Sequence, residues 1–209
     1  MVKGQVLISL AIITMIVAHA TAGWAGANAH HKMAVHIKSH PTSCAKGCPT
    51  FTGCNQIKTT WPTCGDIDVL PVFYDLVEYV EYNVVEFGLM WPPEWYSMSW
   101  VRCAGDIALG TLRIPGDGTA IAWTACQRSW AAAPGYGWVA AHSPGFVRLV
   151  PNVATSMYGV VDCTRMPGPY HDWPAFVSSA GVCGMIGEDP CRAVDTRRPS
   201  SSEIRSMFK

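Results

Sequence analysis

The chain has 209 residues, only 14% of them charged, and its 15 basic residues balance its 15 acidic residues. A formal charge of zero leaves no basic surface to grip phosphates, which argues against nucleic acid as a partner. Nine Trp, 19 Gly and 15 Pro favour short strands broken by tight turns over long helices. So low a charged fraction also favours self-association.

Residues 1–22 have the composition of a secretory signal peptide. A basic start precedes a predominantly apolar run over residues 6–17, and Ala20-Thr21-Ala22 places small residues where a signal peptidase reads them. The run is too short to span a bilayer as a helix, which takes about 20 apolar residues, and no later segment reaches that length. A second small triplet, Ala25-Gly26-Ala27, leaves the cleavage site open. We expect a secreted or cell-surface protein with no membrane span after cleavage.

Residues 23–43 show no sustained hydrophobic period, and we interpret them as an extended linker. The segment carries four imidazoles: His30, His31, His36 and His40. If cleavage followed Ala27, the terminus Asn28-Ala29-His30 could enclose Cu(II) or Ni(II) in a square plane of nitrogens, a geometry these ions prefer. A copper-binding exported protein is therefore one alternative function. A solvated His-rich linker, the other interpretation, needs no cofactor.

Nine cysteines follow the predicted signal peptide, and residues 44–66 hold the first four. These are Cys44, Cys48, Cys54 and Cys64. In an oxidising compartment thiols pair unless a metal holds them. Zinc is disfavoured because Pro41 interrupts any helix that would align these cysteines with His36 and His40. We expect two disulfides among the four cysteines, within a loop segment.

A β-domain is predicted over residues 67–192. From Val84 to Trp91, apolar side chains recur at every second position, the period of a half-buried strand. A helix over residues 77–87 is the competing interpretation, since its Val and Phe residues also fit one helical face. The enrichment in β-branched and aromatic residues favours strands.

A hairpin is predicted around Pro115-Gly116, between strands in residues 99–114 and 119–126. Proline fixes its own φ and glycine accepts a positive φ, as a type II turn requires. With these two residues central, Cys103 lies about two positions out of register with Cys126. A β-bulge would supply that offset, so we favour a Cys103–Cys126 disulfide.

Further short strands are expected in residues 137–142, 145–150 and 157–163, separated by Pro and Gly. The last three cysteines should pair with one another, leaving one thiol over in the whole chain: Cys163, Cys183 and Cys191. Regularly spaced strands predict an all-β, disulfide-stapled β-sandwich. Residues 193–209 form a linker and tail, in which Ser200–Glu203 matches a capping box that opens a short C-terminal helix.

A further pattern consists of the segments Glu86–Pro92, Glu94-Trp95, Cys103, Gly105–Gly110, Pro115–Gly118 and Trp123–Gln127. Together these segments resemble a group of uncharacterised exported proteins of uncultured bacteria, and the resemblance extends over residues 82–209. Members of the group end in a Pro-Thr-Trp-like stretch, then Ile-Lys and an aromatic-basic terminus. Pro199, Ile204-Arg205 and Phe208-Lys209 match that ending, whereas Ser201 stands where the Trp would be. The resemblance implies secretion and a β-domain with a short terminal tag, and no chemistry.

Catalytic patterns are weak. The acidic residues before and within the first long strands are Asp66, Asp68, Asp75, Glu78, Glu81 and Glu86. Glu78 and Glu86 would share one face of a strand, and two carboxylates about 5 to 9 Å apart could hydrolyse a glycosidic bond. His142-Ser143 and His171-Asp172 lack the strained G-x-S-x-G turn of a serine nucleophile. A secreted glycan hydrolase is the second alternative function.

Tryptophan offers a binding function instead. Most of the indoles from Trp91 to Trp173 must fill the core, but one or two exposed faces could hold a ligand. Trp95 and Trp130, beside Pro or Ala, are the candidates. The sequence therefore predicts a binding or structural module at the bacterial cell surface, with an envelope polymer, a glycan or a second copy as partner.

Overall fold

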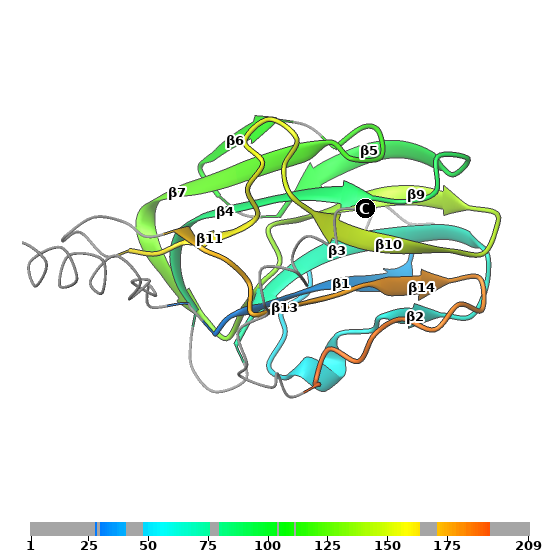
Figure 1. Ribbon diagram of the computed structural model, residues 1–209, viewed down its shortest axis with the longest axis horizontal. Coiled ribbons are helices and arrows are strands. Elements are labelled where there is room, and N and C mark those ends of the chain that lie inside the picture. The colour runs from blue at the N-terminus through cyan, green and yellow to red at the C-terminus, as the bar shows by residue number, and fades with distance from the viewer. Residues whose placement is uncertain are drawn as a thin grey trace, which may run out of the picture.

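The computed structural model describes residues 28, 30–40, 48–75, 80–103, 105–110, 112–163 and 171–192. Two β-sheets share one hydrophobic core, as the all-β sandwich prediction requires (Figure 1). The six-stranded sheet consists of β1 (Lys32–Ser39), β3 (Gly65–Tyr74), β5 (Tyr96–Arg102), β8 (Ala131–Ala132), β9 (Gly135–Ala141) and β13 (Phe176–Ser178). Its strand order is β13-β1-β3-β9-β5, with β8 also beside β3.

The eight-stranded sheet consists of β2 (Thr60–Trp61), β4 (Val80–Met90), β6 (Ile107–Gly110), β7 (Gly118–Ser129), β10 (Gly145–Val150), β11 (Gly159–Val161), β12 (His171–Asp172) and β14 (Ala180–Val182). Its order is β12-β11-β4-β10-β14-β2, and β7 joins β4 to β6. Most pairs are antiparallel, but β1 with β13 and β14 with β2 are parallel. Segments from the beginning and end of the described chain thus lie side by side (Figure 1).

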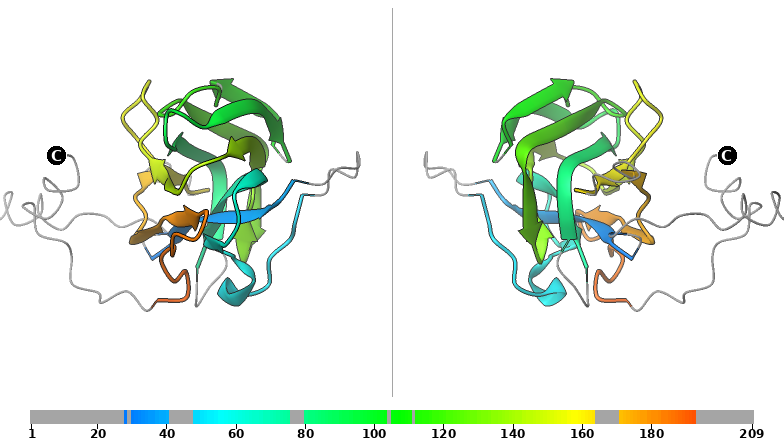
Figure 2. Two further views of the ribbon diagram at one scale, coloured as in Figure 1. Left: turned by 90° about the vertical axis from the view of Figure 1, so that its right-hand side faces the viewer. Right: turned by 90° about the vertical axis from the view of Figure 1, so that its left-hand side faces the viewer.

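The core between the sheets follows the strand period. In β4, Val85, Phe87 and Leu89 are all buried, and they belong to one apolar cluster with odd-numbered residues of β1 and β3, such as Val35 and Phe73. The predicted alternation from Val84 to Trp91 is therefore confirmed, and β4 is a strand rather than a helix over the described part of residues 77–87. The end-on views of Figure 2 show the strands closing around this interior.

A second, smaller apolar cluster lies on the outer face of the six-stranded sheet. Even-numbered residues of β1 and β3, among them Val72 and Tyr74, pack there against Phe51 and Ile57 of the cysteine-rich segment. A 3-10 turn, η1 (Cys54–Gln56), lies in the same segment. The Tyr74 hydroxyl donates to the carbonyl oxygen of Pro190 at 2.6 Å. The cysteine-rich loop is thus a third layer on the sandwich.

The linker predicted over residues 23–43 is wrong for residues 32–39, which form a strand. Residues 32–39 form β1, which pairs with β3 along its whole length and with β13 on its other edge. Six of its eight residues are buried, because the core covers one face and the cysteine-rich segment covers the other. The first strand of the domain is therefore an interior strand.

The Pro115-Gly116 turn is confirmed, with a shorter hairpin than predicted. Gly116 has a φ of +94°, and the Asp117 amide donates to the Ile114 carbonyl at 3.1 Å across the turn. The flanking strands β6 and β7 pair in antiparallel register. Residues 96–102, however, form β5 and pair with β9 in the other sheet. Cys103 therefore lies beside β9, away from β7.

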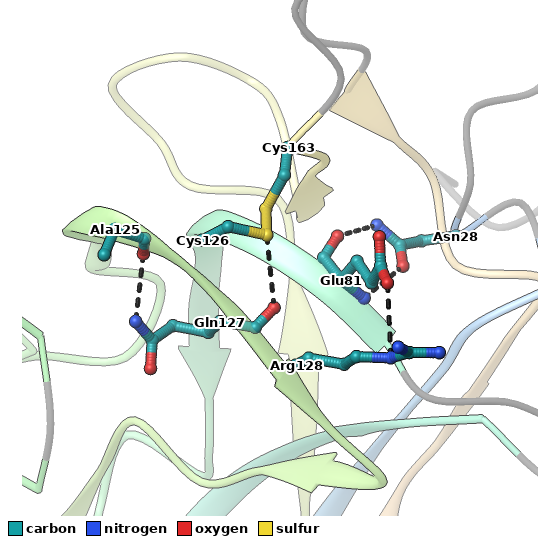
Figure 3. Close-up of a disulfide and its surroundings, with 7 residues drawn as sticks. All are labelled: Asn28, Glu81, Ala125, Cys126, Gln127, Arg128 and Cys163. Atoms are coloured by element: carbon teal, nitrogen blue, oxygen red, sulfur yellow. Dashed lines mark hydrogen bonds and ion pairs between the residues drawn. A yellow bond between two sulfur atoms is a disulfide. The ribbon is translucent and has the colours of Figure 1, made fainter.

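The predicted disulfide connectivity is wrong throughout. Cys103 bonds to Cys48 rather than to Cys126, and Cys126 bonds to Cys163 (Figure 3). Cys54 bonds to Cys191, and Cys64 bonds to Cys183. The bonded cysteines are separated by 55, 37, 137 and 119 residues, respectively. All eight cysteines in the described ranges are paired; the ninth, Cys44, lies outside them. Four disulfides are typical of an oxidising, extracytoplasmic compartment.

Several expectations fall on residues that the structure does not describe. These are the signal peptide, its cleavage sites, and the tail over residues 193–209 with its short helix. In the described part of the chain, no helix is both long and apolar enough to cross a bilayer.

Peptide mapping of the unreduced protein should recover four crosslinked peptide pairs, joining Cys48 to Cys103, Cys54 to Cys191, Cys64 to Cys183 and Cys126 to Cys163. The reduced protein is the control, since every crosslinked mass should resolve into its two peptides. A pair joining Cys48 to Cys54, or Cys183 to Cys191, would contradict the layer arrangement, because those cysteines belong to different covalent links in the fold.

Candidate functional site

Trp173 carries the most exposed indole of the described tryptophans, with 51% of its surface accessible. It follows β12 directly, and Tyr158 directly precedes β11, the strand that pairs with β12. The Tyr158 and Trp173 rings meet edge to face, with centroids 5.2 Å apart. His171 meets the same indole edge to face at 5.4 Å. We call these three rings the Trp173 surface.

Gly159 allows the two strands to approach closely beneath this surface. The register pairs Val160 with Asp172, so one further step places Gly159 opposite Trp173. Gly159 has a φ of +134°, and a Cβ added there would lie 2.2 Å from the Asp172 carbonyl oxygen. Only glycine fits both the backbone angle and the space. Because Gly159 has no side chain, β11 and β12 can lie close enough to hold the rings of the Trp173 surface together.

A tight turn before Tyr158 is held to the sheet by Glu86. Asn152 Nδ2 donates to Glu86 Oε1 at 2.9 Å, and the Thr155 hydroxyl donates to the same oxygen. Glu86 is only 7% exposed. Its carboxylate therefore anchors the turn, which leaves it poorly placed to act on a glycan as half of a Glu pair. Glu78, the other member of that pair, lies outside the described residues.

The two tryptophans predicted to bind a ligand both pack against other side chains in the structure. Trp95 is 3% exposed, and its Nε1 donates to the Ser143 hydroxyl at 2.9 Å. Ser143 in turn donates to Glu94 Oε1 at 3.1 Å, so this serine is not a free nucleophile. Trp130 is partly buried and stacks on Tyr74 at 5.8 Å. Both indoles make packing contacts, so neither presents a fully exposed face, and their binding role stays a prediction.

The four N-terminal histidines do not converge on one point. His31 and His40 flank β1, and at about 3.3 Å per strand residue they lie roughly 30 Å apart. His40 Nδ1 bonds to Asp68 Oδ1 at 2.6 Å, and its ring stacks on Trp138. His30 is exposed. Within the described ranges, no group of three or more His, Cys, Asp or Glu could hold a metal ion. The four histidines His30, His31, His36 and His40 therefore do not form one shared metal site.

Two of these histidines are held neutral by burial. His31 is fully buried, which lowers its pKa to about 4, and its Nδ1 lies 2.7 Å from the Asn28 carbonyl oxygen. Because that oxygen can only accept, Nδ1 carries the proton. Burial likewise lowers the pKa of His36 to about 4, and its Nδ1 accepts the Lys58 amide at 2.9 Å. Inside the fold, His31 therefore serves as a hydrogen-bond donor and His36 as a hydrogen-bond acceptor.

Sequence reasoning missed Trp173 although the signal was present. Trp173 directly precedes Pro174, whereas Trp95, the indole selected near proline, lies two residues after Pro93. A flat indole that is half exposed and braced on two sides can stack on the apolar face of a ligand. Burial also raises the pKa of Tyr158, so its hydroxyl stays protonated at neutral pH.

Acidification should destabilise the protein through His31 and His36. Their folded pKa values lie below the unfolded value of 6.5, so their contribution is complete above pH 6.5 and is lost as the pH falls towards 4. His36→Asn keeps an acceptor for the Lys58 amide and removes the titration. Urea unfolding at pH 7.5 and 4.5 should show that this variant loses about 2–3 kcal/mol less than the parent protein. The exposed-site control His142→Gln should behave like the parent; a similar loss in all three proteins would contradict the assignment.

Gly159→Ala should destabilise the protein more than Gly65→Ala. Both glycines have nearly the same φ, +134° and +136°, but a Cβ at Gly65 meets nothing within 4 Å. The backbone strain is therefore common to both variants, and the clash with Asp172 belongs to Gly159 alone. Denaturant unfolding should give Gly159→Ala an additional loss of about 1–3 kcal/mol. Equal losses would show that the close approach is not required.

No protein-family model, curated protein or solved structure matches this chain. The candidate site consequently rests on its own geometry: an exposed indole, two rings that brace it and a glycine that brings their strands together.

Proposed function

We propose that the protein is a secreted binding module of the bacterial cell surface that holds an envelope glycan on the Trp173 surface. The observation that carries the proposal is the half-exposed Trp173 indole, fixed between Tyr158 and His171. An indole immobilised in the free protein loses little conformational entropy on binding. That is an advantage for a ligand held mainly by stacking.

Charge and shape favour a neutral polymer as the ligand. The chain carries no net charge, so neither a polyanion nor a polycation gains long-range attraction. Sugar rings present apolar C–H faces that match an indole in area and flatness. Val153 and Met157 are exposed on the turn before Tyr158 and add apolar surface to the segment that leads into that ring. A glycan chain with one face on Trp173 and its edge towards this turn suits the surface.

Export and the bacterial setting have separate support. The paired cysteines fit an oxidising compartment, and residues 1–22 have signal-peptide composition. The resemblance of residues 82–209 to exported bacterial proteins supports a location at the bacterial envelope. Binding rather than hydrolysis is favoured because the Glu86 carboxylate is engaged by Asn152 and Thr155.

Trp173→Ala should weaken glycan binding by at least about 10-fold, the loss expected when a central aromatic contact is removed. The measurement is a binding screen on isolated envelope fractions and purified glycans, followed by titration of the strongest ligand. Because Trp173 is half exposed, its loss should leave the melting temperature nearly unchanged. Trp173→Phe should retain most of the affinity.

Ile186→Ala is the matched control, since Ile186 is 80% exposed and lies in the segment after β14, which three strands of the sheet separate from β12, the strand before Trp173. It should bind like the parent protein. If Trp173→Ala and Ile186→Ala bind equally well, the Trp173 surface is not the binding site. If the parent protein binds none of the glycans or envelope fractions, the proposed function itself is contradicted.

A further inference from the structure

Asn28, the first residue that the structure describes, is held more firmly than the end of a linker. It is 3% exposed, and its side chain bonds to the Glu81 backbone in both directions. Asn28 Nδ2 donates to the Glu81 carbonyl oxygen at 2.5 Å, and the Glu81 amide donates to Asn28 Oδ1 at 2.9 Å (Figure 3). The side chain therefore acts as a short strand segment beside the start of β4.

The main chain of Asn28 is bonded as well. Its carbonyl oxygen accepts the His31 amide at 2.9 Å and faces His31 Nδ1 at 2.7 Å. Its nitrogen donates to Asp172 Oδ2 at 2.9 Å, and Asp172 is 5% exposed. Asn28 thus connects the entry to β1, in one sheet, with β4 and β12 in the other. Its nitrogen points at a buried carboxylate.

The sequence directly before Asn28 is the small triplet Ala25-Gly26-Ala27, in which the first and last residues have the size that a signal peptidase reads. We infer that the exported chain is cut between Ala27 and Asn28 and that the freed amino group of Asn28 forms an ion pair with Asp172. The inference rests on the proposed export. It replaces Ala20-Thr21-Ala22 as the cleavage signal.

The cut is an amide hydrolysis by a signal peptidase. Water adds its oxygen to the Ala27 carbonyl carbon, the C–N bond breaks, and Ala27 leaves with a carboxylate. The Asn28 nitrogen takes up protons and becomes an ammonium group. An amide offers Asp172 one neutral donor, whereas an ammonium offers three charged ones at the same place. Cleavage therefore strengthens a bond that the fold already positions.

The same geometry bears on copper. A square-planar site on Asn28-Ala29-His30 needs the free amino group as a ligand. In the folded protein that nitrogen is engaged by Asp172, so copper and the carboxylate compete for it. The bond between the Asn28 nitrogen and Asp172 also holds β12 in place immediately before Trp173. It therefore links the new terminus to the Trp173 surface through one residue.

The first test is the intact mass and terminal sequence of the full chain expressed with export and disulfide formation. We expect a terminus at Asn28. A terminus at Gly23, or an uncleaved chain, would overturn the inference. Glycan binding is measured separately, so loss of the proposed function would not be confused with failure of this cleavage.

The second test compares oxidised chains that start at Gly23 and at Asn28, each with and without Asp172→Asn. In the chain starting at Asn28, Asp172→Asn removes a buried ion pair and should lower the melting temperature by about 5 °C or more beyond its effect in the longer chain. Asp66→Asn is the control, because it removes an exposed acidic residue and should affect both chains alike. An equal effect of Asp172→Asn in both, or copper bound by the folded chain through its amino group, would contradict the ion pair.

Discussion

The fold depends on one strand, β1, being inserted between β3 and β13. Its partners come from opposite ends of the domain, so neither the six-stranded sheet nor the core is complete until the last strands arrive. The Cys54–Cys191 and Cys64–Cys183 disulfides also join early and late segments, because they link the cysteine-rich segment to the chain after β14. Asn28, four residues before the start of β1, adds hydrogen bonds to β4 and β12. Early and late segments therefore stabilise each other at every layer.

This arrangement explains why the sequence pattern of residues 32–39 does not predict a strand. In β4 the apolar residues Val85, Phe87 and Leu89 recur at every second position and face the core, and this alternation predicted β4 correctly. In β1 both faces are covered, so residues on the second face are also buried. Two of them are polar: Lys32 donates through Nζ to the Arg192 carbonyl oxygen, and His36 accepts an amide. Polar side chains with buried partners look like a solvated linker when those partners are unknown.

The same limit applies to the cysteines and to the site. The Pro115-Gly116 turn was predictable because its geometry is set by two neighbouring residues. Disulfide partners are set by which strands lie side by side. β5 pairs with β9 in the six-stranded sheet instead of joining the predicted hairpin, and this places Cys103 next to Cys48. The exposure of Trp173 likewise depends on two-residue and three-residue strands, β12 and β11, which are too short to leave a periodic pattern. Local chemistry predicted the class of fold, and long-range pairing decided the site.

The order of the cysteines has a consequence for biogenesis. As the chain emerges, Cys48, Cys54 and Cys64 become available together, yet each has its partner at least 55 residues downstream. An oxidase that joins thiols in order of appearance would trap non-native crosslinks among these three. Thiol–disulfide exchange must then reshuffle them through mixed disulfides. Production of the native protein consequently calls for a disulfide isomerase or a glutathione redox buffer, and an oxidant alone is a poor substitute.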